Sequence, residues 1–368
     1  MRIAQVAPLF ESVPPKYYGG TERVVSWLTE ELVAQGHDVT LFASGDSETK
    51  ARLWPVTHRS LRLDKHCVDE LAHHINLLEQ VIEMQDEFDV IHFHIGYLHF
   101  PMARRLRTPH VSTQHGRLDL ADLVALYSRF RELPNISISD DQRSPMPWMN
   151  WVATCYHGLP LDAYRFHEGS GGYFAFLGRI SPEKRVDRAI EVAKWLDVPL
   201  KIAAKVDKID VEYFETTIRP LVDHPLVDFI GEIGEGEKEA FLGNAAAVIF
   251  PIDWPEPFGI VMIESLACGT PVIAYKRGSV PEVITHGVDG FVVDNIEDAV
   301  AAAASTTIDR RACRATFERR FSSATMAQRH VETYESVIAS PLGPPEIAPT
   351  AEADAIATWS AEMLERRD

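Results

Sequence analysis

The sequence has few cysteines and no long apolar run. Its four cysteines are scattered over 368 residues and form no Cys-x-x-Cys pair or other metal-ligand spacing. This distribution favours reduced thiols and a cytoplasmic location over a disulfide framework. The longest apolar stretches, such as residues 245–252, are far shorter than the ~20 residues that a membrane-spanning helix needs. We therefore expect no transmembrane segment, while peripheral contact with a membrane surface stays open.

Basic residues are also in deficit. The chain has 36 Lys and Arg against 54 Asp and Glu, which gives a formal net charge of −18. Such a balance opposes general attraction to nucleic acid, so we expect no nucleic-acid partner. The N-terminus reaches Pro8 and then Pro14 without a sustained apolar segment, and we expect no secretory signal there.

Alternating strand and helix patterns run through the whole chain. Short apolar runs predict strands at 3–9, 39–43, 89–95, 110–113, 173–177, 200–204, 226–230, 246–250 and 271–275. Apolar side chains at helical spacing predict helices at 21–36, 68–85, 183–196 and 211–221. Thr21 is the expected N-cap of the first helix. This order is typical of parallel sheets with right-handed crossovers.

The pattern pauses at residues 170–172 and then starts again, which predicts two domains. We place the first Rossmann-like α/β domain at 1–168 and the second at 169–340. Residues 341–368 form a tail whose helix-like end could pack back on the first domain. Ligands of open parallel sheets bind beyond the carboxyl ends of the strands, so we expect two such edges to face each other across a cleft.

The most informative stretch is residues 255–274, which read PEPFGIVMIESLACGTPVIA. They follow a predicted strand and open a helix, with Pro257 expected in the first helical turn. Glu256 lies in the loop, and Gly259 lets a ligand approach the free backbone N–H groups. Glu264 follows seven residues after Glu256. Carboxylates at these two positions suit sugar and ribose hydroxyls, although two isolated Glu residues would more often be ordinary surface acids.

A second cluster lies at the end of the first strand of the second domain. Arg179 follows a glycine there, and Lys184 and Arg185 follow the turn Ser181-Pro182. Positioned cations at a strand end stabilise the charge on a diphosphate, whereas Arg-Lys spacing alone would favour surface ion pairs. Because Lys184 and Arg185 are adjacent, either could supply the second cation.

Two features of the first domain also suit a ligand. Gly19 and Gly20 join the first strand to the first helix and allow close backbone approach to an anion, although a plain tight turn is the alternative. His115 follows another strand and precedes Gly116. A lone histidine is usually structural, but its position at the end of a strand and before a glycine makes His115 a candidate residue of the site.

The two glutamates within residues 255–274 resemble the hallmark of glycosyltransferase family 4, of the group 1 type. The resemblance covers about residues 1–340. It implies the GT-B fold and transfer of a sugar, hexosyl-like and with retention, from a nucleotide sugar on the second domain to an acceptor hydroxyl on the first.

The resemblance also implies individual roles. Catalysis is expected from His115, Arg179, Lys184 and Glu256. Donor binding is expected from Gly19, Gly20, Arg179, Lys184, Glu256, Phe258, Gly259, Ile260, Glu264 and Glu282. Within this set Glu264 contacts the ribose, Arg179 and Lys184 contact the diphosphate, and Glu256 with the backbone of 258–260 holds the donor sugar.

Two segments depart from the family pattern. In residues 277–284, Ser279 stands where the family has a second glycine, which leaves the phosphate contacts there open. In residues 139–142, Asp141 stands where a small residue is usual, and we expect only an acceptor-side role for this turn.

No cofactor is expected, because the nucleotide sugar is a substrate. No metal is expected either. No Asp-x-Asp occurs in the chain, whereas metal-dependent glycosyltransferases of the other major fold commonly use one. His92 and His94 share one face of a strand, but without a third ligand we expect them to line the cleft or to satisfy buried hydrogen bonds.

Three alternatives stay open from the sequence. A nicotinamide-dependent oxidoreductase fits two Rossmann-like halves and Asp46, but the Gly-x-Gly-x-x-Gly fingerprint is absent. A non-catalytic sugar-nucleotide-binding protein would keep the pocket without transfer. A GT-B phosphorylase or epimerase would use the same pocket with phosphate or water. The donor base (UDP-, GDP- or ADP-sugar), the acceptor (glycan, lipid or small molecule) and the oligomeric state are not indicated.

Overall fold

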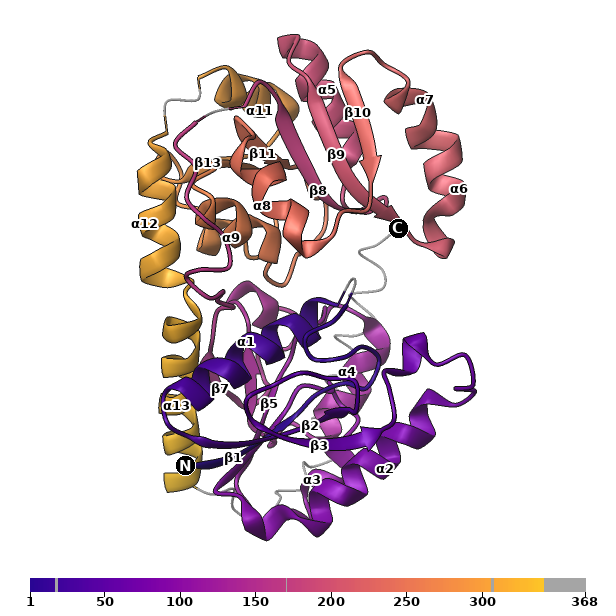
Figure 1. The fold of residues 1–368 in the computed structure, drawn as a ribbon, viewed down its shortest axis with the longest axis vertical. Coiled ribbons are helices and arrows are strands. Elements are labelled where there is room, and N and C mark those ends of the chain that lie inside the picture. Colours follow the sequence, from indigo (N-terminus) through magenta and orange to yellow (C-terminus); the bar gives the residue numbers. More distant parts are fainter. Residues whose placement is uncertain (17–18, 170, 306–307, 341–368) are drawn as a thin grey trace. The chain divides into compact units, whose positions relative to one another are not determined.

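The structure, a computed structural model, describes residues 1–16, 19–169, 171–305 and 308–340. The chain divides into two compact units (Figure 1). The first unit comprises Met1–His157 together with the chain from Ser323, and the second comprises Gly158–Ser322. The predicted tail, 341–368, lies outside the described residues.

The first unit is built on a seven-stranded sheet whose paired strands are all parallel. Its strands, in the order β3-β2-β1-β4-β5-β6-β7, are β1 (Arg2–Val6), β2 (Asp38–Ser44), β3 (Arg52–Thr57), β4 (Val90–Phe93), β5 (His110–Thr113), β6 (Asn135–Ser137) and β7 (Trp151–Thr154). Its α-helices are α1 (Gly20–Ala34), α2 (Glu70–Glu83), α3 (Phe100–Ala103), α4 (Ala121–Arg129) and α13 (Ser323–Ala339).

The second unit has a six-stranded parallel sheet. Its strands, in the order β10-β9-β8-β11-β12-β13, are β8 (Phe174–Ile180), β9 (Leu200–Val206), β10 (Val227–Gly231), β11 (Ala247–Phe250), β12 (Val272–Tyr275) and β13 (Gly290–Val293). Its helices are α5 (Val186–Leu196), α6 (Val211–Tyr213), a π-helical turn (Phe214–Ile218), α7 (Arg219–Val222), α8 (Glu235–Gly243), α9 (Ile260–Ala267), α10 (Val280–Val283), α11 (Ile296–Ala304) and α12 (Arg310–Arg320).

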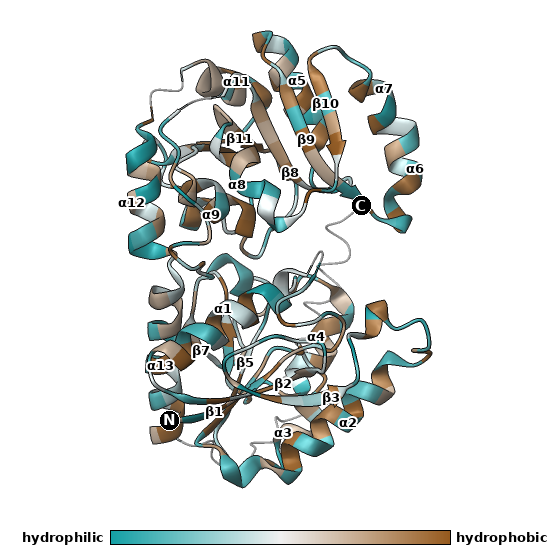
Figure 2. Ribbon diagram, viewed as in Figure 1, coloured by the Kyte–Doolittle hydropathy of each residue, from teal (hydrophilic) through white to brown (hydrophobic). Residues whose placement is uncertain are grey.

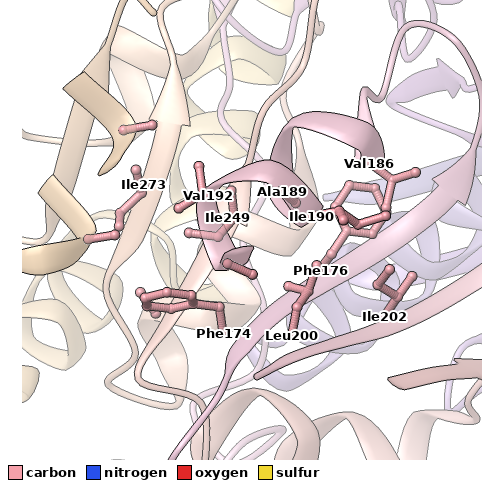
Figure 3. Close-up of a cluster of buried hydrophobic side chains, with 14 of the residues drawn as sticks. Phe174, Phe176, Val186, Ala189, Ile190, Val192, Leu200, Ile202, Ile249 and Ile273 are labelled. Atoms are coloured by element: carbon pink, nitrogen blue, oxygen red, sulfur yellow. The ribbon is translucent and has the colours of Figure 1, made fainter. Parts of the chain in front are cut away.

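Burial of one apolar helix face against each sheet explains why these segments fold as they do. In the second unit, Phe174, Ile190, Leu200, Ile249 and Ile273 belong to one buried cluster made by β8, α5, β9, β11 and β12 (Figure 3). Hydrophobic and hydrophilic residues alternate along helices α2 and α5 (Figure 2). This amphipathic pattern is what the helical spacing of their apolar residues predicts.

The compact units differ from the predicted domain ranges at two segments. Residues 158–168 belong to the second unit, where the backbone N–H of Leu159 donates to the carbonyl of Phe321 and Arg314 donates to the carbonyls of Leu161 and Tyr164. Helix α13 belongs to the first unit, where it packs on α1. These anchors join residues far apart in sequence, so local patterns do not reveal them.

Candidate functional site

The second unit has a reversal of strand order between β8 and β11, where the chain continues to β9 on one side and to β12 on the other. Arg179 lies near the carboxyl end of β8, Lys184 lies in the turn that follows, and Glu256 lies in the loop after β11. Three of the predicted site residues therefore come from the two strands that flank this reversal. In open parallel sheets this is the position where ligands bind.

Lys184 and Glu256 are in direct contact. The Lys184 ammonium donates to Oε2 of Glu256, and the indole N–H of Trp254 donates to the same oxygen at 3.1 Å. The ammonium also lies 5.2 Å from the centre of the Trp254 ring, within cation–π range. A backbone hydrogen bond of 2.8 Å from Asp253 to Glu183 ties the two loops together. The pair is thus held by both loops at the strand reversal.

Arg185 has other partners. Its backbone adopts the left-handed conformation, with φ of 52°, as the N-cap of α5. Its guanidinium pairs with Asp187 at 2.8 Å and with Asp253 at 3.1 Å. Of the two adjacent cations, the structure therefore places Lys184, and not Arg185, against the predicted sugar-binding carboxylate.

Arg179 lies among carboxylates. Its guanidinium is 2.9 Å from Glu183, 3.6 Å from Asp207 and 3.9 Å from Asp210. Lys205 and then Arg179 lower the pKa of Asp207 below its usual value. Burial raises the pKa of Asp210, whose Oδ2 makes no hydrogen bond to any described residue. An anion that binds Arg179 must compete with these acids.

Glu264 forms a separate polar group on helix α9. Its side chain is buried, and its Oε1 accepts hydrogen bonds from the Tyr164 hydroxyl and the Lys238 ammonium, both at 2.9 Å. The same hydroxyl lies 2.6 Å from Oε1 of Glu235, so the two carboxylates compete for its one proton. Although burial opposes the charged form, Glu264 and Glu235 raise the pKa of Lys238. Sequence analysis missed Tyr164, Lys238 and Glu235, because no local motif marks them.

The loop at 277–279 lies against the loop that carries Glu256. The backbone N–H of Ser279 donates to the carbonyl of Glu256 at 3.0 Å, and its hydroxyl donates to the carbonyl of Phe258 at 2.9 Å. A Cβ at Gly278 would lie 2.4 Å from backbone atoms of Glu256. The serine that replaces the family's glycine therefore supports this loop. Glu282 is half-buried on α10.

Helix α9 begins later than predicted. Gly259 is its N-cap in the left-handed region, with φ of 77°, and Ile260 is its first residue. The expectation that Pro257 lies in the first helical turn is wrong, because the chain turns at Gly259. The Phe258 side chain is 2% exposed and packs against Phe321. Only backbone groups of Phe258 are thus suited to a ligand.

In the first unit the strand order reverses between β1 and β4. Gly19 is the N-cap of α1, so the prediction that Thr21 caps this helix is wrong, because the helix starts at Gly20. A Cβ at Gly19 would lie 2.8 Å from Pro15, and only glycine fits there without a shift. The neighbouring Tyr17 and Tyr18 lie outside the described residues.

His115 follows β5, and its Nε2 lies 2.9 Å from Nδ1 of His94, which follows β4. Burial lowers the pKa of His115 to about 3 and holds the pKa of His94 well below its usual value. His92 and His94 are both buried and hydrogen-bonded, which confirms one of the two roles expected for them.

The turn at 139–142 supports the His115 loop through Gln142. Its side-chain amide donates to the carbonyls of Gln114 and Gly116, both at 2.8 Å. Asp46, the residue that favoured an oxidoreductase, instead holds its own loop. Hydrogen bonds from Ser44 and Ser60 lower the pKa of Asp46 although burial opposes ionisation.

Comparisons with known proteins agree with this architecture. The sequence model described as "Glycosyl transferases group 1" matches residues 165–320, and that described as "Glycosyltransferase Family 4" matches residues 18–158. A phosphatidyl-myo-inositol mannosyltransferase of Mycobacterium leprae is 25% identical over 92% of this chain and 98% of its own.

Solved structures show the same fold. A glycosyltransferase involved in avilamycin A biosynthesis superposes with a TM-score of 0.71 at 23% identity, over 92% of this chain and 98% of its own. HepE of Anabaena, crystallised with UDP and glucose, gives a TM-score of 0.69 at 19% identity, over 91% and 100% of the two chains.

The fold and the matching sequence models therefore define a glycosyltransferase with the GT-B fold, built from two Rossmann-like parallel-sheet domains. Within that class, the chain belongs to glycosyltransferase family 4, of the group 1 type. Within the described ranges, no helix combines the length and the apolar character needed to cross a membrane.

Proposed function

We propose that this protein transfers a hexosyl group from a nucleoside diphosphate sugar to an acceptor hydroxyl, with retention of configuration and without a metal or cofactor. The observation that carries the proposal is the Lys184–Glu256 pair at the strand reversal of the second unit. A nucleotide sugar presents a diphosphate next to a sugar. A cation in contact with a carboxylate suits this junction, because the cation binds the diphosphate and the carboxylate binds sugar hydroxyls.

The donor residues take the following roles in this proposal. Arg179 and Lys184 bind the diphosphate, Glu256 binds hydroxyls of the sugar, and backbone groups of Phe258, Gly259 and Ile260 lie at the start of α9. The first-turn N–H groups of that helix favour an anion. Gly19, Gly20 and Glu282 complete donor binding. The first unit supplies His115 and binds the acceptor.

Glu264 is assigned to the ribose. Tyr164 and Lys238 both donate to its Oε1, so Oε2 is the oxygen that we assign to the ribose diol. Because a buried carboxylate discriminates strongly against a missing donor, this position suits a ribonucleotide.

Retention rests on the family and on the chemistry of the second unit. Arg179 and Lys184 stabilise the departing diphosphate, and the acceptor hydroxyl enters on the face that the diphosphate leaves. The bond from the anomeric carbon to the diphosphate oxygen breaks, the bond to the acceptor oxygen forms, and the acceptor proton passes to the departing diphosphate. No sequence motif assigns a carboxylate as a covalent nucleophile of the kind used by retaining hydrolases.

Two of the relatives support a nucleotide-sugar donor without selecting its base or the acceptor. HepE was crystallised with UDP and glucose, and the mycobacterial relative is named as a mannosyltransferase for phosphatidyl-myo-inositol. A lipid, glycan or small-molecule acceptor is compatible with the proposal. We also propose a cytoplasmic location, in keeping with four cysteines that are all free.

The proposal is tested first by a thermal-shift panel of UDP-, GDP- and ADP-sugars on the full chain. A true donor at 100 times its Kd stabilises the protein by about 2.7 kcal/mol, so at least one sugar is expected to raise the melting temperature by several degrees. If no nucleotide sugar stabilises the protein at millimolar concentration, the proposal fails.

Reaction with the stabilising donor then tests stereochemistry and metal use. We expect an NMR spectrum of the product to show the anomeric configuration of the donor, with a rate that a chelator leaves unchanged. An inverted product would disprove retention. Activity lost with the chelator and restored by Mn²⁺ would disprove metal independence.

A further inference from the structure

A continuous hydrogen-bond chain runs through the interior of the first unit and ends at His115. It joins the imidazole of His92 to the Tyr334 hydroxyl at 2.7 Å, Tyr334 to the amide of Gln5 at 3.0 Å, and Gln5 to His94 at 2.7 Å. His94 then contacts His115 at 2.9 Å. These residues come from β4, α13, β1 and the loop after β5, so the chain links four segments of the unit.

The direction of this chain follows from its geometry. The Gln5 amide nitrogen donates to the Tyr334 oxygen, so the single hydroxyl proton of Tyr334 is free to donate to Nδ1 of His92. His92 then donates from Nε2 to Thr113 at 2.7 Å.

The Gln5 amide also fixes the direction of the hydrogen bonds that run from Gln5 through His94 to His115. Because its nitrogen is used by Tyr334, the Gln5 amide presents its oxygen to His94, which must donate from Nε2. A neutral imidazole with a proton on Nε2 has a lone pair on Nδ1. Nδ1 of His94 therefore accepts from Nε2–H of His115. This leaves His115 with a bare lone pair on Nδ1.

Nδ1 of His115 is buried and makes no hydrogen bond to any described residue. A buried polar atom without a partner is unfavourable and calls for an explanation in a native structure. The adjacent Gly116 is exposed, and a Cβ built there would meet no atom within 4 Å. The unpartnered Nδ1 thus belongs to a residue that lies between the carboxyl end of β5 and an exposed glycine.

We infer that Tyr334 and Gln5 are positioning residues that hold His115 as the neutral Nε2–H tautomer, so that its Nδ1 accepts a hydrogen bond from a sugar hydroxyl. The identity of the hydroxyl rests on the proposed function, whereas the tautomer does not. If the Gln5 amide were rotated by half a turn, every hydrogen bond would reverse and His115 would carry its proton on Nδ1. The two directions therefore predict opposite tautomers.

Side-chain ¹⁵N NMR of the ligand-free full chain, with His115 assigned by a His115→Gln spectrum, distinguishes the two. We expect the Nδ1 resonance of His115 at the unprotonated position and the Nε2 resonance at the protonated position. A proton on Nδ1, or on both nitrogens, would overturn the inference. The measurement needs no nucleotide sugar, so a failure of the proposed donor chemistry leaves its result interpretable.

A pair of Tyr→Phe variants tests the positioning role. Tyr334→Phe removes the oxygen that accepts from the Gln5 amide nitrogen, so the amide loses a contact that fixes its orientation. Both nitrogen resonances of His115 are then expected to shift towards each other as the tautomers mix. Tyr127→Phe is the matched control, since Tyr127 is also buried and donates at 2.8 Å to Gln114, next to His115 but outside the chain. The control is expected to leave the tautomer unchanged.

Unchanged resonances in a folded Tyr334→Phe protein would overturn the role of Tyr334. If that variant does not fold, the wild-type spectrum still decides the tautomer. Addition of the stabilising donor provides the last arm: a hydroxyl that donates to Nδ1 shifts the Nδ1 resonance of His115 towards the protonated position. A bound donor and acceptor that leave this resonance unmoved would overturn the assignment to a sugar hydroxyl.

Discussion

Lys184 and Arg185 are adjacent cations with different partners, which allows a test of the diphosphate site at single residues. Lys184 contacts Glu256, whereas Arg185 pairs with Asp187 and Asp253. Charge-assisted hydrogen bonds contribute about 1.5–3 kcal/mol, so we expect Lys184→Ala to weaken donor binding by roughly 10- to 100-fold. Isothermal titration calorimetry with the stabilising donor measures the loss.

Arg185→Ala is the control for this change. It removes a cation one residue away. Because the left-handed backbone is about as unfavourable for Ala as for Arg, donor affinity is expected to fall by no more than about threefold. Equal losses in the two variants would contradict the assignment of the diphosphate to Lys184.

Tyr164 offers a second test at this scale, because it shows how the ribose carboxylate is held. Its hydroxyl lies within hydrogen-bond distance of both Glu264 and Glu235, which compete for its one proton. One hydrogen bond is worth about 1 kcal/mol, so Tyr164→Phe is expected to weaken nucleotide binding by roughly 2- to 10-fold in the same titration. Tyr173→Phe, which removes a 2.7 Å bond to the carbonyl of Phe241, is expected to leave affinity unchanged. A larger effect from Tyr173→Phe would argue against this role.

Among the elements, helix α9 depends on the backbone conformation of Gly259. A Cβ at this left-handed position would lie 2.8 Å from Met262 and 3.2 Å from Phe250. Strain of about 1–2 kcal/mol from the left-handed backbone adds to overpacking of about 1–3 kcal/mol. We expect Gly259→Ala to lower the free energy of unfolding by roughly 2–5 kcal/mol, measured by urea denaturation.

The variant Gly287→Ala measures the cost of the left-handed backbone without the crowding that is present at Gly259. Gly287 has the same φ of 77°, but a Cβ there would meet nothing within 4 Å. Gly287→Ala is therefore expected to cost only about 1–2 kcal/mol. If both variants lost the same free energy, crowding at Gly259 would play no part in the stability of α9.

The elements also show what the sequence alone could predict. The inner strands β1, β4, β5, β8, β11 and β12 were predicted close to their observed positions, because their buried faces produce continuous apolar runs. The edge strand β3 was not predicted, since its residues are half-exposed or exposed and include Pro55. β6, β7 and β13 were also missed. β6 has three residues, two of them polar, and β7 and the centre of β13 are half-exposed or exposed, so none gives a continuous apolar run.

The residues of the candidate site also fall into those that the sequence could predict and those that it could not. Glu256, Glu264, Arg179 and Lys184 belong to local motifs and could be proposed from the sequence. Tyr164 and Lys238 meet Glu264 only in the folded second unit, across 100 and 26 residues of chain. Tyr334 meets Gln5 across 329 residues. Such contacts are set by tertiary packing, which a single sequence does not encode as a readable pattern.

At the scale of the whole molecule, buried histidines of the first unit make stability depend on pH. Burial lowers the pKa of His110 and of His330 from 6.5 to about 4. Because the folded pKa is below the unfolded pKa, the unfolded chain binds protons first, and stability present above pH 6.5 is lost as the pH falls towards 4. At pH 5 each group costs about 2 kcal/mol.

Urea denaturation at pH 7 and at pH 5 measures this loss. His330→Gln removes one of these titrating groups, and its loss between these pH values is expected to be about 2 kcal/mol smaller than that of the wild type. An equal loss in the variant and the wild type would mean that His330 is not held neutral in the folded protein.

The central claim, that the second unit binds a nucleoside diphosphate sugar with its ribose on Glu264, is tested most directly by one calorimetric comparison. The wild type and Glu264→Gln are each titrated with the nucleoside diphosphate of the stabilising donor and with its 2′,3′-dideoxy form. The wild type is expected to prefer the ribose form by roughly 10- to 100-fold, and the variant by only a few-fold. An identical preference in both proteins, or no binding of either ligand to the wild type, would contradict the claim.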